Sequence, residues 1–329
     1  MKLVNFLTEK RGTVRAGVVL DEIVLDLKLA WTNFGKKGGA SMPLDSVESY
    51  TMLSPEQKNM LHAIVNKMAD LDLMDINQVM DDELAYPLNY VKLVAPVRKP
   101  GALRDFFAFE RHVKMAFGLN NRKVPAEWYQ FPVFYFSNPG SIQAPNAVIV
   151  RPANSSQLDY ELEIACVIGK EGRNITSERA EEYIAGYTIF NDWSARDLQR
   201  VETRVGQGPA KGKDFASSLG PWLVTPDELE ERKTDRKTVF DLEMRAYLNG
   251  GLRSQANMRE LYYSFAEMIV HASKNATLYP GDVLASGTCG SGCLLELTGG
   301  QGPWLQEGDE VVLEIDGLGQ LRNRIGAAG

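Results

Sequence analysis

The chain has 329 residues, of which 44% are hydrophobic and 24% are charged, and its formal net charge is −7. These values are typical of an ordinary globular protein with one large or two moderate domains, and no apolar run approaches the length of a membrane span. The negative charge argues against a nucleic-acid partner, because phosphate binding requires a basic face.

The first part of the chain alternates polar and apolar residues in three short stretches up to about residue 28, which predicts antiparallel strands. Residues 55–73 place apolar side chains on one helical stripe, and residues 91–96 predict a strand closed by Pro96. We place a domain boundary near residue 90. The prediction is a small N-terminal domain over 1–90 and a larger, strand-rich α+β domain over 91–329.

The larger domain alternates predicted strands with a few helices. The predicted strands and extended segments are 128–136, 159–168, 187–190, 239–248, 283–286, 294–297 and 310–315. The predicted helices are 176–185, opened by Thr176, and 264–273. A helix over 102–114 would place Asp105 and His112 two turns apart on one face.

Cysteine usage and the N-terminus bear on the location of the protein. Cys166, Cys289 and Cys293 lack CxxC spacing, so they predict neither a disulfide framework nor a zinc knuckle. No apolar stretch of a signal peptide follows Met1 and Lys2. We therefore expect a cytoplasmic protein.

Acidic residues recur at the start of one predicted strand, in Asp159-Tyr160-Glu161-Leu162-Glu163. Alternate residues of a strand share a face, so Glu161 and Glu163 point the same way, and so does Asp159. Like charges side by side on a half-buried strand repel, and a hard divalent cation would remove the repulsion. A solvated strand face is the alternative, and this segment alone does not choose between the two.

Asp192 follows the predicted strand 187–190 and is well placed as a rigid metal ligand. Its alternative role is to cap the following helix. Arg196, one helical turn further, could hold the carboxylates by charge-assisted hydrogen bonds.

Together these motifs resemble the fumarylacetoacetate hydrolase family over residues 95–325. The matching segments are Asp159-Tyr160-Glu161-Leu162-Glu163, Asn191-Asp192-Trp193-Ser194-Ala195-Arg196-Asp197, Gly212-Lys213-Asp214-Phe215 and Ser286-Gly287-Thr288. The resemblance implies a mixed β-sandwich roll as catalytic domain, preceded by a small barrel-like domain. It also implies a homodimer and a small diketo-acid or 2-oxo-acid substrate.

The resemblance assigns roles to individual residues. It implies Asp105, Glu161, Glu163 and Asp192 as ligands of Mg²⁺ (or Mn²⁺ or Ca²⁺), with Ser217 at a second-metal position. It implies His112 as the base that activates water, Glu296 as the carboxylate that orients it, and Lys213 as a charge that stabilises negative intermediates. Substrate contacts would come from Arg122, Tyr135, Gln199 and Thr288, and Arg196 is a further candidate.

The implied activity is hydrolysis of a carbon–carbon bond in a β-diketo acid such as fumarylacetoacetate. Phe107 and Thr203 stand where fumarylacetoacetase has substrate-binding tyrosines, so the substrate stays open. The alternatives are an acylpyruvase, an oxaloacetate decarboxylase or a sugar-acid dehydratase on the same scaffold, and a binding protein without activity. An intact set of acids, histidine and lysine argues against the last.

Overall fold

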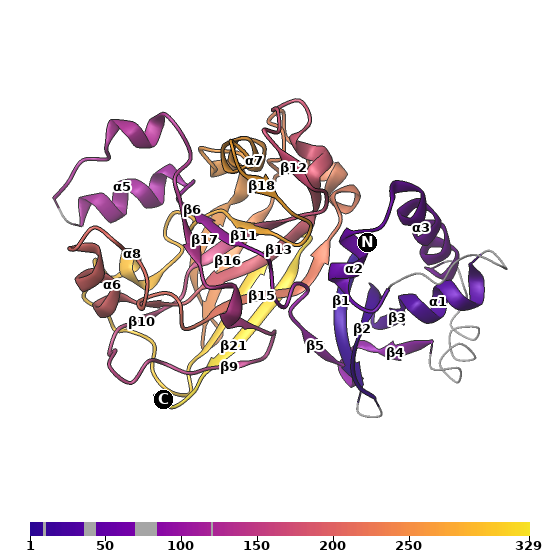
Figure 1. Cartoon of the computed structure of the whole chain (residues 1–329). Helices are drawn as coiled ribbons and strands as arrows, with labels where there is room; N and C mark the ends of the chain where they lie inside the picture. The colour runs from indigo at the N-terminus through magenta and orange to yellow at the C-terminus, as the bar shows by residue number, and fades with distance from the viewer. Residues whose placement is uncertain (9–10, 36–43, 70–83, 120) are drawn as a thin grey trace.

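The computed structural model describes residues 1–8, 11–35, 44–69, 84–119 and 121–329, and these form a strand-rich α+β structure (Figure 1). The strands of the first 150 residues are β1 (Lys2–Thr8), β2 (Arg11–Leu20), β3 (Ile23–Asp26), β4 (Ala85–Pro87), β5 (Lys92–Val94), β6 (Leu103–Phe106), β7 (Phe134–Ser137), β8 (Ile142–Gln143) and β9 (Val148–Ile149). Those that follow are β10 (Leu158–Asp159), β11 (Leu162–Ile168), β12 (Gly172–Arg173), β13 (Ile184–Asp192), β14 (Ser194–Ala195), β15 (Ser217–Val224), β16 (Glu243–Leu248), β17 (Gly251–Asn257), β18 (Thr277–Leu278), β19 (Val283–Ala285), β20 (Glu310–Ile315) and β21 (Gly319–Ile325).

The helices are fewer and mostly short. The α-helices are α1 (Leu27–Phe34), α2 (Val47–Thr51), α3 (Pro55–Ala69), α5 (Glu110–Gly118), α6 (Arg196–Thr203), α7 (Phe265–Ala272) and α8 (Leu294–Leu297). Short 3₁₀ helices are η1 (Leu88–Tyr90), η2 (Ala126–Tyr129), η3 (Pro139–Ser141), η4 (Ala180–Tyr183), η5 (Pro226–Arg232) and η6 (Met258–Glu260). Among the described residues, none of these helices has the length and apolar character needed to cross a membrane.

The largest sheet runs through both parts of the chain. Its order is β4-β3-β2-β1-β15-β13-β11-β19-β6-β7, with β5 added to β1 and β8 added to β15. Because β1 pairs with β15, the N-terminal strands continue the sheet of the larger part, and the described residues form no closed barrel there. The α+β fold class is confirmed, while the division into domains at residue 90 stays a prediction.

Strand β11 is buried on both faces, which explains its continuous apolar run. Leu162, Ile164 and Cys166 pack in a cluster with the five-stranded sheet β17-β16-β20-β21-β9 and with α7. Ala165 and Val167, on the opposite face, pack in a second cluster with the N-terminal elements. Each fully buried Leu or Ile contributes about 1.5–3 kcal/mol, so this strand is a rigid support for what lies at its ends.

Three predicted elements are wrong in type or extent. Residues 294–297 form helix α8 instead of a strand, because Asp159 accepts hydrogen bonds from the N–H groups of Leu294 (2.8 Å) and Leu295 (3.0 Å) and so caps its start. The helix predicted over 176–185 is only the 3₁₀ turn η4, because β13 begins at Ile184 and pairs with β11. The strand predicted over 239–248 begins only at Glu243, and helix 55–73 is described up to Ala69, with its predicted end outside the described residues.

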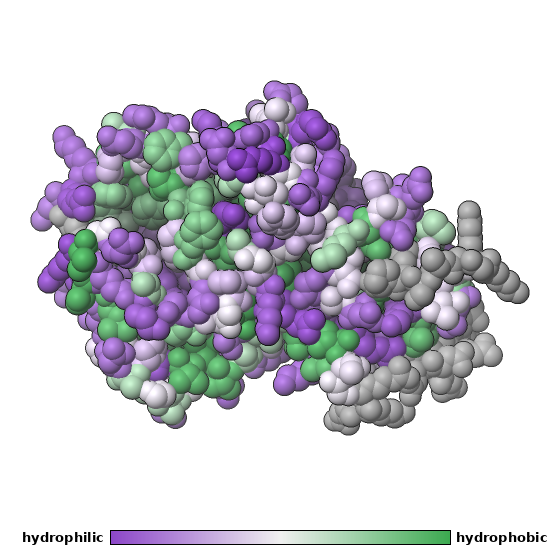
Figure 2. All heavy atoms as spheres, viewed as in Figure 1, coloured by the Kyte–Doolittle hydropathy of each residue, from purple (hydrophilic) through white to green (hydrophobic). Residues whose placement is uncertain are grey.

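Figure 1 shows α5, α6 and α8 grouped at the side of the molecule opposite the N-terminal helices α1 to α3. On the face shown in Figure 2, hydrophobic residues form separate patches among hydrophilic ones. Helices α5 and α8 contact each other, which brings segments almost 180 residues apart to one place. The candidate site lies there.

Candidate active site

A cavity of about 820 Å³ contains most of the residues predicted for the site. Ten of them line it, namely Asp105, His112, Arg122, Tyr135, Glu161, Glu163, Arg196, Gln199, Lys213 and Thr288. Three do not line it and are buried, namely Asp192, Ser217 and Glu296. The fold therefore brings together side chains that are spread over almost 200 residues of sequence.

Three of the acids lie on one face of the large sheet, on strands β6, β11 and β13. Each acid lies two residues from a member of the cluster that packs on the N-terminal elements, and so points to the same face of the sheet. The pairs are Asp105 with Leu103, Glu163 with Ala165, and Asp192 with Phe190. Strand β19 lies between β6 and β11, and β13 lies on the other side of β11. Strand parity and sheet order thus bring three carboxylates from distant segments to the same face of the sheet. Glu161, just before β11, completes the set.

The acids form a group that fits a divalent cation. Asp105, Glu161 and Glu163 each offer an oxygen, and these oxygens lie within 4.8 Å of one another. Burial, followed by the neighbouring carboxylates, raises the pKa of Asp105 and Glu163 well above the usual range. Among the described buried atoms, Oδ1 of Asp105 and Oδ1 of Asp192 have no hydrogen-bond partner. Unpartnered carboxylate oxygens in a crowded acidic group are the donors that Mg²⁺, Mn²⁺ or Ca²⁺ prefer.

Two buried cations hold one of these acids in its charged form. The Lys213 ammonium lies 2.6 Å from Glu161 and 2.7 Å from Asp192, and the Arg196 guanidinium lies 2.8 Å from the other Glu161 oxygen. Burial alone would raise the pKa of Glu161, but Lys213 and Arg196 outweigh it and hold that pKa below its ordinary value. The carboxylates of Asp192 and Glu161 in turn raise the pKa of Lys213 against the effect of burial.

Backbone and hydroxyl groups orient the remaining acids. The N–H of Gly287 donates to Glu163 (3.0 Å), and the Tyr135 hydroxyl donates to Asp192. Gly287 has φ +79°, and a Cβ there would lie 2.2 Å from the carbonyl oxygen of Phe106, so the close approach requires glycine. Thr288 lies next to Glu163, with its hydroxyl 3.5 Å from Oε1.

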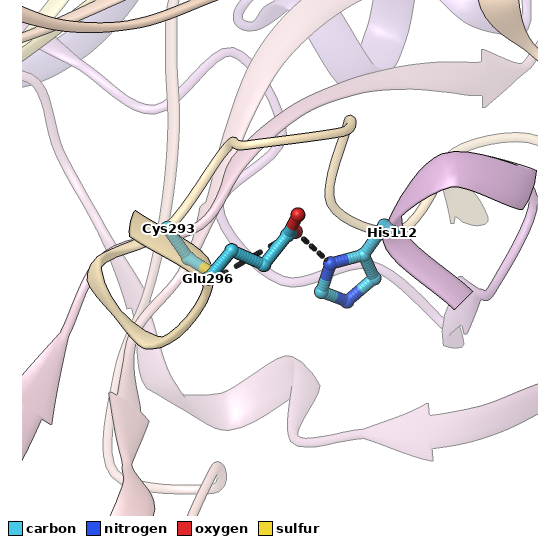
Figure 3. A group of neighbouring side chains, drawn as sticks. All are labelled: His112, Cys293 and Glu296. Carbon is cyan, nitrogen blue, oxygen red and sulfur yellow. Dashed lines mark hydrogen bonds and ion pairs between the residues drawn. The ribbon is translucent and has the colours of Figure 1, made fainter. Parts of the chain in front are cut away.

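His112, which lines the cavity, pairs with the buried carboxylate of Glu296 (Figure 3). Nδ1 of His112, on α5, contacts Oε1 of Glu296, on α8, and the N–H of Ser291 holds the other Glu296 oxygen at 2.8 Å. The structure thus places the two residues in contact, and their catalytic roles stay a prediction. The idea that Asp105 and His112 share a helix face is wrong, because Asp105 lies on β6, yet both side chains line the cavity.

Asp159 matches no ligand role in the family resemblance, and the structure shows that it supports the site instead. It is fully buried, caps α8, and forms an ion pair of 2.8 Å with Arg196, which also contacts Glu161. Asp159 therefore connects the helix that carries Glu296 to the acids of the metal site. Its shared parity with Glu161 and Glu163 was the only signal in the sequence.

The remaining predicted residues lie around this centre. Arg122 packs over Phe117 (5.4 Å), and Gln199 accepts a hydrogen bond from Arg196 (3.0 Å). Ser217 lies opposite Asp192 in the β13–β15 pair, and its assignment to a second metal stays a prediction. Phe107 lines the cavity and packs edge-on against His112 (5.2 Å), while Thr203 lines it from the end of α6.

Comparison with known proteins decides the family. Residues 102–326 match the model of the fumarylacetoacetate hydrolase C-terminal domain. The chain belongs to the fumarylacetoacetate hydrolase family. It is 29% identical to the fumarylacetoacetase of Oryza sativa subsp. japonica, over 74% of this chain and 70% of that protein. It is 34% identical to a bifunctional isomerase/decarboxylase of 4-hydroxyphenylacetate degradation from Salmonella dublin, over 59% of this chain and 41% of that protein.

A solved structure gives the same result for the fold. The fumarylacetoacetate hydrolase of Exiguobacterium antarcticum aligns over 99% of both chains, with a TM-score of 0.71 and 27% identity. The protein is thus an enzyme of a family that includes hydrolases, isomerases and decarboxylases, and its own acids form a group that could hold a metal ion. Homodimer formation and cytoplasmic location stay predictions.

Proposed function

We propose that the protein is a metal-dependent hydrolase that cleaves a carbon–carbon bond in a β-diketo acid such as fumarylacetoacetate. The observation that carries the proposal is the buried His112–Glu296 pair at the cavity that also contains the acids. A metal site alone would serve enolate chemistry of several kinds. A histidine held by a carboxylate beside that site adds a base for water, which hydrolysis requires.

The geometry defines what the histidine does. Because Nδ1 faces the Glu296 carboxylate, Nδ1 carries the proton and Nε2 is the basic nitrogen. Nε2 takes a proton from water, and the resulting hydroxide attacks the substrate carbonyl. The carbon–carbon bond next to that carbonyl then breaks, and the leaving enolate carbon takes up the proton held on Nε2. Glu296 stabilises the imidazolium that forms and keeps the ring in position, so no protein nucleophile is needed.

The acids and the cavity complete the proposed site. Asp105, Glu161, Glu163 and Asp192 would hold the divalent cation, which when bound polarises a carbonyl and stabilises an enolate. Lys213, buried against Glu161 and Asp192, adds fixed positive charge where negative charge develops. Arg122, Tyr135, Gln199 and Thr288 line the space left for the substrate.

The test is a Mg²⁺-dependent activity screen over fumarylacetoacetate, acylpyruvates and oxaloacetate. We expect hydrolysis of a diketo acid, lost when Mg²⁺ is removed and restored when it is returned. Each candidate is run also with His112→Ala, because decarboxylation of oxaloacetate needs the enolate but no attacking water. Turnover of oxaloacetate alone, unchanged in His112→Ala, would overturn the hydrolase assignment in favour of a lyase.

A further inference from the structure

A second group of metal-binding side chains lies beside the acids. His112, Cys293 and Glu296 each offer one ligand atom, and these atoms lie within 4.8 Å of one another. Figure 3 shows the three side chains converging from α5 and from the start of α8. All three are buried, and His112 also lines the cavity.

The thiol of Cys293 does not cap the helix at whose start it lies. Cys293 occupies the N-cap position of α8, but its side chain makes no capping hydrogen bond, because Asp159 caps this helix instead. Its sulfur contacts Oε1 of Glu296 at 3.8 Å. The thiol thus faces the carboxylate that orients the proposed base.

The ligand set differs in kind from the acids of the metal site. Oxygen ligands alone suit Mg²⁺ or Ca²⁺, whereas one imidazole, one thiolate and one carboxylate suit Zn²⁺ or Co²⁺. Bonds of about 2.3 Å to sulfur and about 2.0 Å to oxygen place these two ligands roughly 3.5 Å apart in a tetrahedral site. The separation of 3.8 Å between Sγ and Oε1 is close to that value.

We propose that His112, Cys293 and Glu296 form an inhibitory site for a thiophilic divalent ion such as Zn²⁺. The ion breaks the hydrogen bond between Nδ1 of His112 and Oε1 of Glu296 and takes Nδ1, Sγ and Oε1 as ligands, and a water molecule fills the fourth position. The Cys293 thiol releases its proton to solvent, and the proton on Nδ1 of His112 is replaced by one on Nε2. The nitrogen that would accept a proton from water is then blocked, so the ion stops hydrolysis without entering the acid site.

The existence of the site does not depend on the proposed function, whereas its inhibitory effect does. Binding is therefore tested first, on the full chain in excess Mg²⁺, by titration with Co²⁺. We expect a near-ultraviolet thiolate-to-cobalt absorption band in the unmodified protein. The band should vanish in Cys293→Ser and persist in Cys289→Ser, whose cysteine is also buried in the same segment but lies outside the group. No band, or a band that survives Cys293→Ser, would overturn the site.

Inhibition is tested with Zn²⁺ in excess Mg²⁺ on the same three proteins. Relative to its own activity without zinc, we expect Cys293→Ser to need at least about 10-fold more Zn²⁺ for half inhibition, because one of three ligands is lost. Equal inhibition of Cys293→Ser and the unmodified protein would overturn the inhibitory effect. If no protein turns over any acid without zinc, the proposed function fails, and the cobalt band still decides the site.

Discussion

The acid site and the His112–Glu296 pair border the same cavity but are supported in different ways. Asp105, Glu163 and Asp192 lie on strands of the large sheet, and β11 is buried on both faces. The histidine pair joins α5 to the four-residue helix α8, across 184 residues of sequence. Asp159 and Arg196 link the two groups through buried ion pairs.

The difference teaches how the two functions could be altered separately. Side chains on a central strand keep their direction as long as the sheet is intact, because parity fixes the face. A contact between two short helices depends instead on capping and on a few polar contacts. Changes around α8 should therefore leave metal binding intact but disturb the position of the base, His112.

The largest effect is expected for Glu163→Ala on β11. We expect Mg²⁺ binding to disappear and activity to fall by more than the factor of about 10⁴ that a general base can supply, because the variant removes a carboxylate of the cation site. Isothermal calorimetry with Mg²⁺ and an activity assay check both parts. Glu163→Gln is the matched variant, since it keeps an oxygen for the Gly287 N–H and removes the charge. Normal Mg²⁺ affinity in Glu163→Ala would contradict the assignment of the acids.

His112→Ala separates the two groups. It should lower kcat by about 10²–10⁴-fold and leave Mg²⁺ affinity unchanged, because the imidazole acts on water and is not among the acids. The same calorimetry and steady-state kinetics decide the outcome. A parallel loss of metal affinity would show that the two groups are one unit.

Asp159→Asn tests the link between them. The variant keeps one oxygen to cap α8 but weakens the ion pair with Arg196, so we expect kcat to fall by about 10–100-fold. Mg²⁺ affinity should change less than kcat, since the acids stay on their strands. The measurement is the ratio of the two changes, by kinetics and calorimetry.

Asp282→Asn is the matched control for this variant. Asp282 is also buried, pairs with Arg104 (3.3 Å), and does not line the cavity. It should cost stability in a thermal melt and spare kcat. Equal losses of kcat in both variants would mean that Asp159 acts only through general stability.

The proximity of two of the acids can be predicted from the sequence for a physical reason. Alternation on a strand places Glu161 and Glu163 on one side of the chain, and this holds wherever the strand lies in the fold. The neighbourhood of His112 and Glu296, in contrast, came from resemblance to a family and not from spacing. No local pattern connects residues that lie 184 positions apart.

The errors of the sequence analysis have the opposite cause. The pattern of residues 294–297 is too short to distinguish a helix from a strand. The segment becomes a helix because Asp159, far away in the chain, caps its start. The N-terminal strands gave no indication that β1 would pair with β15, and the barrel-like domain that the family resemblance implied there is not closed within the described residues. Tertiary contacts decided both elements, and local propensity did not.

Arg122→Gln should have the smallest effect, and it bears on the substrate instead of on either group. Arg122 lines the cavity, packs over Phe117, and forms no ion pair within the described part of the chain, so its charge is available for a substrate carboxylate. Because the Arg122 side chain is exposed, its ion pair with a substrate carboxylate contributes only modestly to binding. We therefore expect KM for a diacid to rise about 3- to 10-fold in Arg122→Gln, with kcat unchanged. Lys123→Gln, one residue away and outside the cavity lining, is the control and should leave KM unchanged. For a monoacid substrate, KM should be the same in Arg122→Gln and in the unmodified protein, because there is no second carboxylate for Arg122 to bind. If KM rises equally for the diacid and the monoacid, Arg122 shapes the cavity wall and does not recognise charge.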